Sequence, residues 1–432
     1  MHDLSSFVGA VDAASARILK RPWECNDAIK RIIDTIVQNR SSICQRIRNS
    51  EIFQAILGDH VSKDDMSKFS SNLSNLSHSK ARYDSVVRAL IRYIAMHKAV
   101  LATARDVATL RRGDEEGHDA EAFLHFVSGP EGAVRDLLAG LLCDAGSITM
   151  RLLRFFDCES FDVSQICRQI GEWCSAVQYF FIERRAFRSP GMFAHQALNN
   201  ITSGIHTVIL QGVPTSIGMP ENSSPNAAME GAYAEINTWI VMGITVMKAE
   251  YPAWEILQAF TPFDILTVDR FAGALQDHLR RLSLAFKLPL DELRRQYGIA
   301  LPVAQALAAA HPEMSNQDLW VAVWEQIGGS MRGGALEKAL ARKCAFSGCT
   351  TSGVEHNHSR QDWLFTKRRP TGLQTELDEI AIVVDLDQDS SELPAILELA
   401  QAIWRKLYTG VRARPHGRPR ADKGMAMSPH TH

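Results

Sequence analysis

Apolar residues recur at helical spacing along most of this chain. In residues 269–286 they mark one face of a helix, and the same spacing runs through 86–100, 132–156 and 166–182. The residues on the first of these faces are Phe271, Leu275, Leu279, Leu282 and Phe286. Runs typical of strands are scarce: residues 380–384 are the best and 206–210 a weaker one. The pattern predicts a mainly α protein with a small sheet remnant near the C-terminus.

Polar and proline-containing stretches divide the helical segments. Residues 67–79 are rich in serine and asparagine, 111–118 are charged and contain glycine, and 211–226 hold three prolines. We expect loops near 111–118 and 211–226. Residues 412–432 are rich in arginine, proline and glycine, and are expected to be disordered.

Bulk properties exclude several classes of protein. The formal charge of −2, from 47 basic and 49 acidic residues, is not that of a general nucleic-acid binder, so any DNA contact must come from local patches. The eight cysteines are scattered, which favours reduced thiols in an intracellular protein. No signal peptide is recognisable, and no uncharged run reaches the roughly 20 apolar residues of a membrane span.

The most informative block is residues 350–369. A short apolar helix is expected before it, over residues 335–341. The block then holds a small-polar turn, Glu355 at the start of a new helix, and the basic cluster Lys367-Arg368-Arg369. This order resembles the C-terminal signature of hAT-type cut-and-paste DNA transposases. Ser352, Glu355 and Ser359 match the family's Ser, Glu and final Ser. His356 and His358 depart from it, standing where Arg and Phe are usual.

The resemblance implies a function for this block. In the family the glutamate is the third metal-binding carboxylate of an RNase H-like fold, and the neighbouring helices form a dimerisation region. Strand cleavage of this kind uses two Mg²⁺ ions held by three carboxylates. The resemblance therefore implies a homodimer of transposable-element origin, located in the nucleus, that contacts DNA. The expected DNA-contacting residues are Lys367, Arg368, Arg369, Arg412, Arg414, Arg418 and Arg420.

A weaker likeness extends upstream and implies a domain order. Residues 80–85, with Tyr83 in place of a tryptophan, are similar to the stretch that opens the helical insertion domain of the family. The expected segments are 1–66, the helical end of a truncated RNase H-like core; 80–345, the helical insertion domain; 346–408, the dimerisation segment; and 409–432, a basic tail. On this alignment the first two catalytic carboxylates would lie before Met1. We therefore expect an incomplete enzyme with Glu355 as a vestigial ligand, no cofactor as it stands, and Mg²⁺ only in a complete parent.

The same residues allow other interpretations. Residues 352–355 form a capping box, with Ser352 at the N-cap and Glu355 three positions later, which a helix start would keep without any metal. The chain would then be a helical protein-interaction scaffold without transposase chemistry. A zinc site from Cys344, Cys349, His356 and His358 is disfavoured, because the two histidines would point to opposite sides of a helix. The basic tail can equally be a solvated end, and the tryptophans at 173, 239, 254, 320 and 324 are expected in the core.

Overall fold

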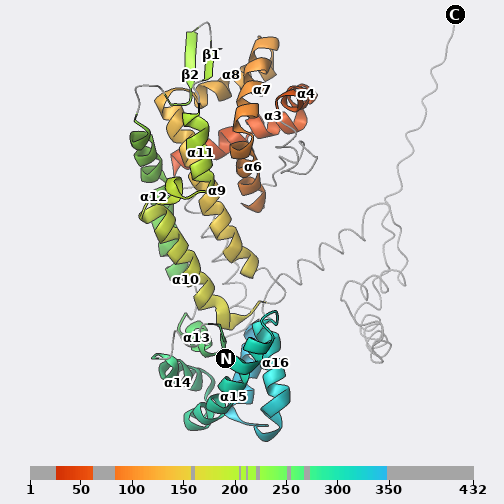
Figure 1. Cartoon of the computed structure of the whole chain (residues 1–432), viewed down its shortest axis with the longest axis vertical. Coiled ribbons are helices and arrows are strands. Elements are labelled where there is room, and N and C mark those ends of the chain that lie inside the picture. The colour runs from red at the N-terminus through yellow and green to blue at the C-terminus, as the bar shows by residue number, and fades with distance from the viewer. Residues whose placement is uncertain are drawn as a thin grey trace, which may run out of the picture. The chain divides into compact units, whose positions relative to one another are not determined.

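The computed structural model divides the chain into two compact units, Met1–Thr351 and Ser352–His432. The structure describes residues 26–61, 83–156, 161–203, 206–210, 213–219, 224–250, 254–266 and 273–347, all of which belong to the first unit. About 80% of the described residues are helical, so the mainly α class is confirmed (Figure 1). No helix within these ranges has the length and apolar character needed to cross a membrane.

The first half of the unit is a bundle built around one long helix. Its elements are α2 (Asp27–Ile33), η1 (Asp34–Gln38), α3 (Ile43–Asn49), α4 (Glu51–His60), α6 (Tyr83–Ala95), α7 (His97–Leu110), α8 (Glu115–Phe126), α9 (Gly129–Phe156), η2 (Val163–Gln165), α10 (Ile166–Val177), η3 (Gln178–Ile182), η4 (Ala186–Arg188), α11 (Phe193–Thr202) and α12 (Pro225–Glu250). Helix α9 packs against α6, α10, α11 and α12, so it is the axis of this half.

A β-hairpin interrupts the helices between α11 and α12. Strand β1 (His206–Leu210) was predicted from its β-branched run and is confirmed; it pairs antiparallel with β2 (Val213–Ile217). Strand β2 lies within residues 211–226, where the sequence predicted only a loop. Pro214 of β2 is tolerated because a two-stranded hairpin has free edges, where a missing backbone N–H breaks no hydrogen bond between the strands. Ser128 forms an isolated bridge to Ile217, which ties the hairpin to the start of α9.

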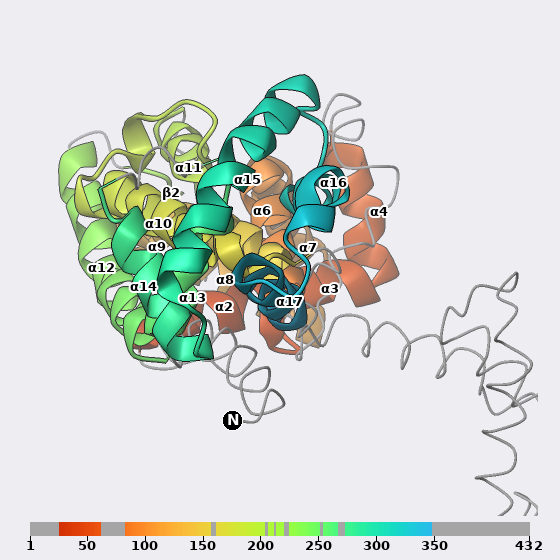
Figure 2. The ribbon, with the colours of Figure 1, turned by 90° about the horizontal axis from the view of Figure 1, so that it is seen from below.

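The second half of the unit is a smaller group of helices. Its elements are α13 (Trp254–Ala259), η5 (Thr261–Phe263), α14 (Leu275–Phe286), α15 (Leu290–Ala310), α16 (Asn316–Ile327), η7 (Gly328–Ser330) and α17 (Ala335–Ser347). Seen from below, these helices lie in front of the longer ones (Figure 2). Their own core is aromatic, with Phe263 lying 5.1 Å from Trp320 and Phe260 5.4 Å from Phe346 between ring centroids.

Local sequence signals account for several helix ends. The side chains of Asn26, Ser42, Ser50 and Ser315 each accept a backbone N–H at the start of α2, α3, α4 and α16 respectively. Helix α14 ends at Phe286, and its C-cap residue Lys287 adopts a left-handed conformation. Helix α8 begins at Glu115, so the loop predicted at 111–118 is shorter than expected.

The periodicity identified the core faces correctly. Val87, Leu90 and Ile94 of α6 are buried, as are Leu279 and Leu282 of α14. The side chains of Trp173, Trp239 and Trp320 are also buried, which confirms their expected core positions. Residues 86–100 are not one helix, however, because the chain turns at Met96 between α6 and α7. Asn200 of α11 donates to the carbonyl oxygen of Ile94 at this break, 2.9 Å away.

Candidate functional site

Every residue predicted to act in catalysis or DNA binding lies outside the described residues. This holds for Glu355, for Lys367, Arg368 and Arg369, and for Arg412, Arg414, Arg418 and Arg420. The strand predicted at 380–384 lies outside them too, and so do three of the four residues of the disfavoured zinc set. The fourth, Cys344, is an exposed free thiol on α17. Within the described part of the chain, no three His, Cys, Asp or Glu side chains converge to hold a metal ion.

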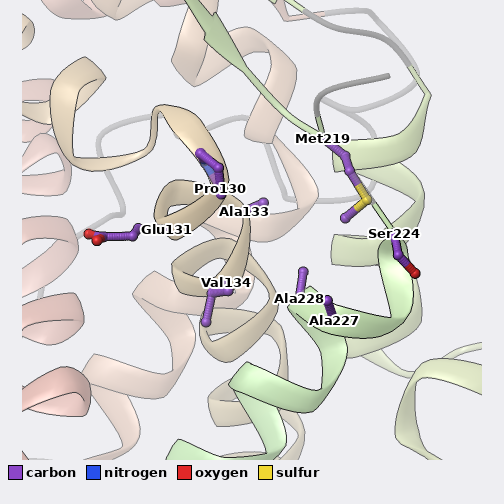
Figure 3. Close-up of a pocket in the computed structure, with 8 residues that line it drawn as sticks. All are labelled: Pro130, Glu131, Ala133, Val134, Met219, Ser224, Ala227 and Ala228. Atoms are coloured by element: carbon purple, nitrogen blue, oxygen red, sulfur yellow. The ribbon is translucent and has the colours of Figure 1, made fainter. Parts of the chain in front are cut away.

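One open cavity lies where the two longest helices begin. It has a volume of about 400 Å³ and lies between the first turns of α9, the first turns of α12 and the end of the β-hairpin. Its walls are formed by Pro130, Glu131, Ala133, Val134, Met219, Ser224, Ala227 and Ala228 (Figure 3). The lining is mostly apolar, and the Glu131 carboxylate points away from Met219 (Figure 3). Such a surface can accept an apolar group, but it presents no pair of side chains for acid–base chemistry.

A smaller cavity of about 120 Å³ lies between α9 and α10. Its polar wall contains Arg151 and Glu172, and its apolar wall contains Trp173. The Trp173 indole N–H donates to the hydroxyl of Thr149, 3.2 Å away, so this ring is fixed against α9. The cavity is about the size of a few water molecules, which suits solvent better than an organic ligand.

Three polar side chains from α6, α7 and α9 form a buried hydrogen-bonded trio: Tyr93, His97 and Asp136. The Tyr93 hydroxyl donates to Oδ1 of Asp136 at 2.6 Å, and Nε2 of His97 lies 2.9 Å from Oδ2 of the same carboxylate. All three side chains are buried, with His97 only 3% exposed. Burial, followed by the negative charge of Asp136, raises the pKa of Tyr93 well above its usual value, so the phenol keeps its proton and remains a donor.

A histidine oriented by an aspartate is the usual arrangement of a general base, but this pair is placed differently. Nε2 of His97 is occupied by Asp136, and Nδ1 is buried with no hydrogen-bond partner among the described residues. Neither of the two cavities above is lined by any of the trio. The geometry therefore supports a structural role, in which one carboxylate fixes α6 and α7 against α9.

A second buried carboxylate, Asp144 of α9, caps another helix. Its two oxygens accept the backbone N–H groups of Phe193 and Ala194, both at 2.8 Å. These N–H groups belong to the first turn of α11, which has no side-chain cap of its own. Burial raises the pKa of Asp144 to about 7, and the two N–H donors, of Ala194 and then Phe193, oppose that rise.

This raised pKa predicts how stability depends on pH. Asp144 binds its proton more tightly in the folded chain (pKa about 7) than in the unfolded one, whose pKa is about 3.8. The free energy of unfolding must then fall as pH rises through this window, by on the order of 2–3 kcal/mol between about pH 5 and about pH 8. We expect Asp144→Asn to remove this fall, because the amide does not titrate.

The measurement is urea unfolding of both proteins across that pH range. Since the substituted amide keeps only one acceptor oxygen for the two N–H groups, Asp144→Asn should be less stable by about 1 kcal/mol near pH 5, and this difference should shrink and then reverse as pH rises. It is the flattened pH dependence that tests the assignment. Parallel curves for the two proteins would show that Asp144 does not titrate in this range.

Neither buried carboxylate was predicted from the sequence. Asp136 and Asp144 lie in the otherwise apolar stretch of 136–145, and a charged residue inside such a stretch signals a buried polar partner. Nothing in the sequence shows which partner it is. No family model, curated protein or solved structure matches the chain. The assignment of function therefore rests on the residues of this chain alone.

Proposed function

We propose that the chain derives from a hAT-type transposase and acts through self-association and contact with DNA, without a complete catalytic site. The observation that carries this proposal is the order of elements along the chain. Helices continue to Ser347, and the block that contains Glu355 follows a few residues later. A long helical insertion before a glutamate-bearing C-terminal segment is what the resemblance implies.

The contacts of the described unit favour a supporting rather than a catalytic role for this helical region. Two of its buried carboxylates, Asp136 and Asp144, bond to side chains and backbone groups inside the core. Under the proposal, an RNase H-like remnant would belong to the segment after Ser347 and would contain Glu355. Magnesium would be a cofactor of a complete parent enzyme, and the expected nuclear location follows from the proposed contact with DNA.

DNA binding by the full chain tests the proposal. We expect a short DNA duplex to bind at about 50 mM salt and to lose most of its affinity at about 200 mM, because binding through phosphates releases counterions. Reversing the charges of Lys367, Arg368 and Arg369 to glutamate should weaken binding at least about tenfold in fluorescence anisotropy. Reversing the four tail arginines in a second variant shows how much the tail contributes.

A matched control reverses three exposed arginines elsewhere, Arg105 within α7 and Arg111 and Arg112 just after it. The net charge change is the same, so a loss of affinity equal to that of the first variant would show only a general charge effect. Light scattering tests self-association: a strict monomer at high micromolar concentration would contradict it. Self-association without DNA binding would instead favour the helical interaction scaffold.

A further inference from the structure

The described unit consists of two groups of helices that the chain connects only once. The N-terminal helix group comprises the elements from α2 to α12, and the C-terminal helix group those from α13 to α17. The chain passes from the first to the second between Glu250 and Trp254. Across the junction, η2 and α10 contact α13, η5 and α17. Each group buries many apolar side chains of its own, and the two sets also touch at the junction, where Val163 and Ile166 are fully buried.

A buried aspartate is the centre of this junction. Oδ1 of Asp162 accepts the backbone N–H and the hydroxyl of Ser164, at 2.9 and 2.7 Å. Oδ2 accepts from the other group, from Nδ2 of Asn316 at 2.6 Å and from Nζ of Lys343 at 2.9 Å. The Asp162 and Lys343 side chains are only 4% and 1% exposed. One carboxylate thus links η2 to the start of α16 and to the middle of α17.

A second ion pair crosses the same junction with the signs exchanged. Arg168 of the N-terminal helix group donates through Nε to Oδ2 of Asp264, 2.9 Å away in the C-terminal helix group. The Asp264 side chain is fully buried and that of Arg168 mostly so. The backbone N–H of Val163 also donates across the junction, to the Ser347 hydroxyl at 3.1 Å. Each group therefore contributes one acid and one base, and only one relative placement satisfies both pairs.

Buried charges of this kind behave differently from an apolar contact. Removing an ion pair from water carries a large desolvation penalty, which its mutual attraction and hydrogen bonds only partly offset. When the junction separates, all four charged groups regain water, so this part of the junction opens at a lower cost in free energy than an apolar contact of the same area. When the junction is closed, the two ion pairs define one relative placement of the helix groups. When it is open, water readily solvates the four charged side chains.

We propose that this junction is a releasable joint, at which the C-terminal helix group separates from the N-terminal helix group while both stay folded. Asp162, Lys343, Arg168 and Asp264 hold the closed arrangement. Asn316 forms hydrogen bonds both across the joint and within its own group, because its Nδ2 also donates to the Phe263 carbonyl oxygen at 2.9 Å. The joint is independent of whether the chain derives from a transposase.

Hydrogen exchange of the full-length protein, followed by mass spectrometry, tests the joint. Asp162→Asn and Lys343→Met each leave one buried charge without its partner, which should promote opening at least about a hundredfold. We expect faster exchange in residues 161–168 and in the ends of α13, α16 and α17 that meet them, with α9 and the centre of α15 unchanged. Lys338→Met is the matched control, because Lys338 is exposed on the same helix as Lys343.

The double variant Asp162→Asn/Lys343→Met distinguishes the effect of an unpaired charge from general misfolding caused by the substitutions. It leaves no unpaired charge from this ion pair, so its exchange should return most of the way to that of the unsubstituted protein. Equal acceleration throughout both groups would overturn the proposal, because it would show that they unfold together. It would also be overturned if the single variants exchanged like Lys338→Met, or if the effects of the two substitutions simply added.

Discussion

Replacing Asp136 by alanine is expected to lower the free energy of unfolding by about 3–5 kcal/mol. The substitution removes the carboxylate that pairs with the Tyr93 hydroxyl and with Nε2 of His97, and both of these groups stay buried. Water cannot replace the lost bonds without opening the contact of α6 and α7 with α9. Urea unfolding at neutral pH, followed by circular dichroism, measures the difference.

The chain contains its own control for this variant. Nε2 of His60 lies 2.7 Å from Oδ2 of Asp106, so the same two residue types form a pair at the surface, where both side chains are about a quarter to a third exposed. Asp106→Ala should therefore cost no more than about 1 kcal/mol. Similar losses in the two variants would mean that burial does not decide the contribution of Asp136.

Gly140→Ala is expected to destabilise the protein by about 1–3 kcal/mol, although alanine is the better helix former. A Cβ atom at this position of α9 would lie 2.8 Å from Cβ of Ala197 and 2.9 Å from Cα of Ala194, both on α11. One neighbour is a backbone atom, so the two helices would have to move apart. The N–H bonds from α11 to Asp144, one turn further along α9, would lengthen with them.

The opposite result is expected for the same substitution on another helix. Gly171 lies in the middle of α10, and an added Cβ would meet nothing within 4 Å. Gly171→Ala should raise the free energy of unfolding by about 1 kcal/mol, since only helix propensity changes. Thermal unfolding of the two variants side by side would decide: a shift of the same sign in both would contradict the close approach of α9 and α11.

Local signals were sufficient for much of this fold. Helical spacing located the buried faces of α6 and α14, because such patterns act within a few turns of chain. The break at Met96 was not predictable in the same way. At this break a carbonyl group of α6 is satisfied by Asn200, more than a hundred residues away in the sequence. The Glu355 block stays a prediction.

The buried polar groups show the same limit. An aspartate in an apolar helix indicates a buried hydrogen-bond partner, but it does not identify that partner. The partners of Asp136 come from α6 and α7, and those of Asp144 come from α11. Asp162 is harder still, since Asn316 and Lys343 lie about 150 and 180 positions further along the chain. Pairings at such separations are determined by how the helices pack, and this packing cannot be read directly from one sequence.

Three positions of α9 lie four residues apart along one side of the helix: Asp136, Gly140 and Asp144. Asp136 bonds to α6 and α7, whereas Gly140 and Asp144 both contact α11, and Tyr93 and His97 are also four residues apart. Together they make a compact search pattern: Tyr-x3-His, then Asp-x3-Gly-x3-Asp within a long apolar segment. Distant relatives whose overall sequence has drifted should retain it, and their genomic neighbourhoods would then reveal whether such chains descend from mobile elements.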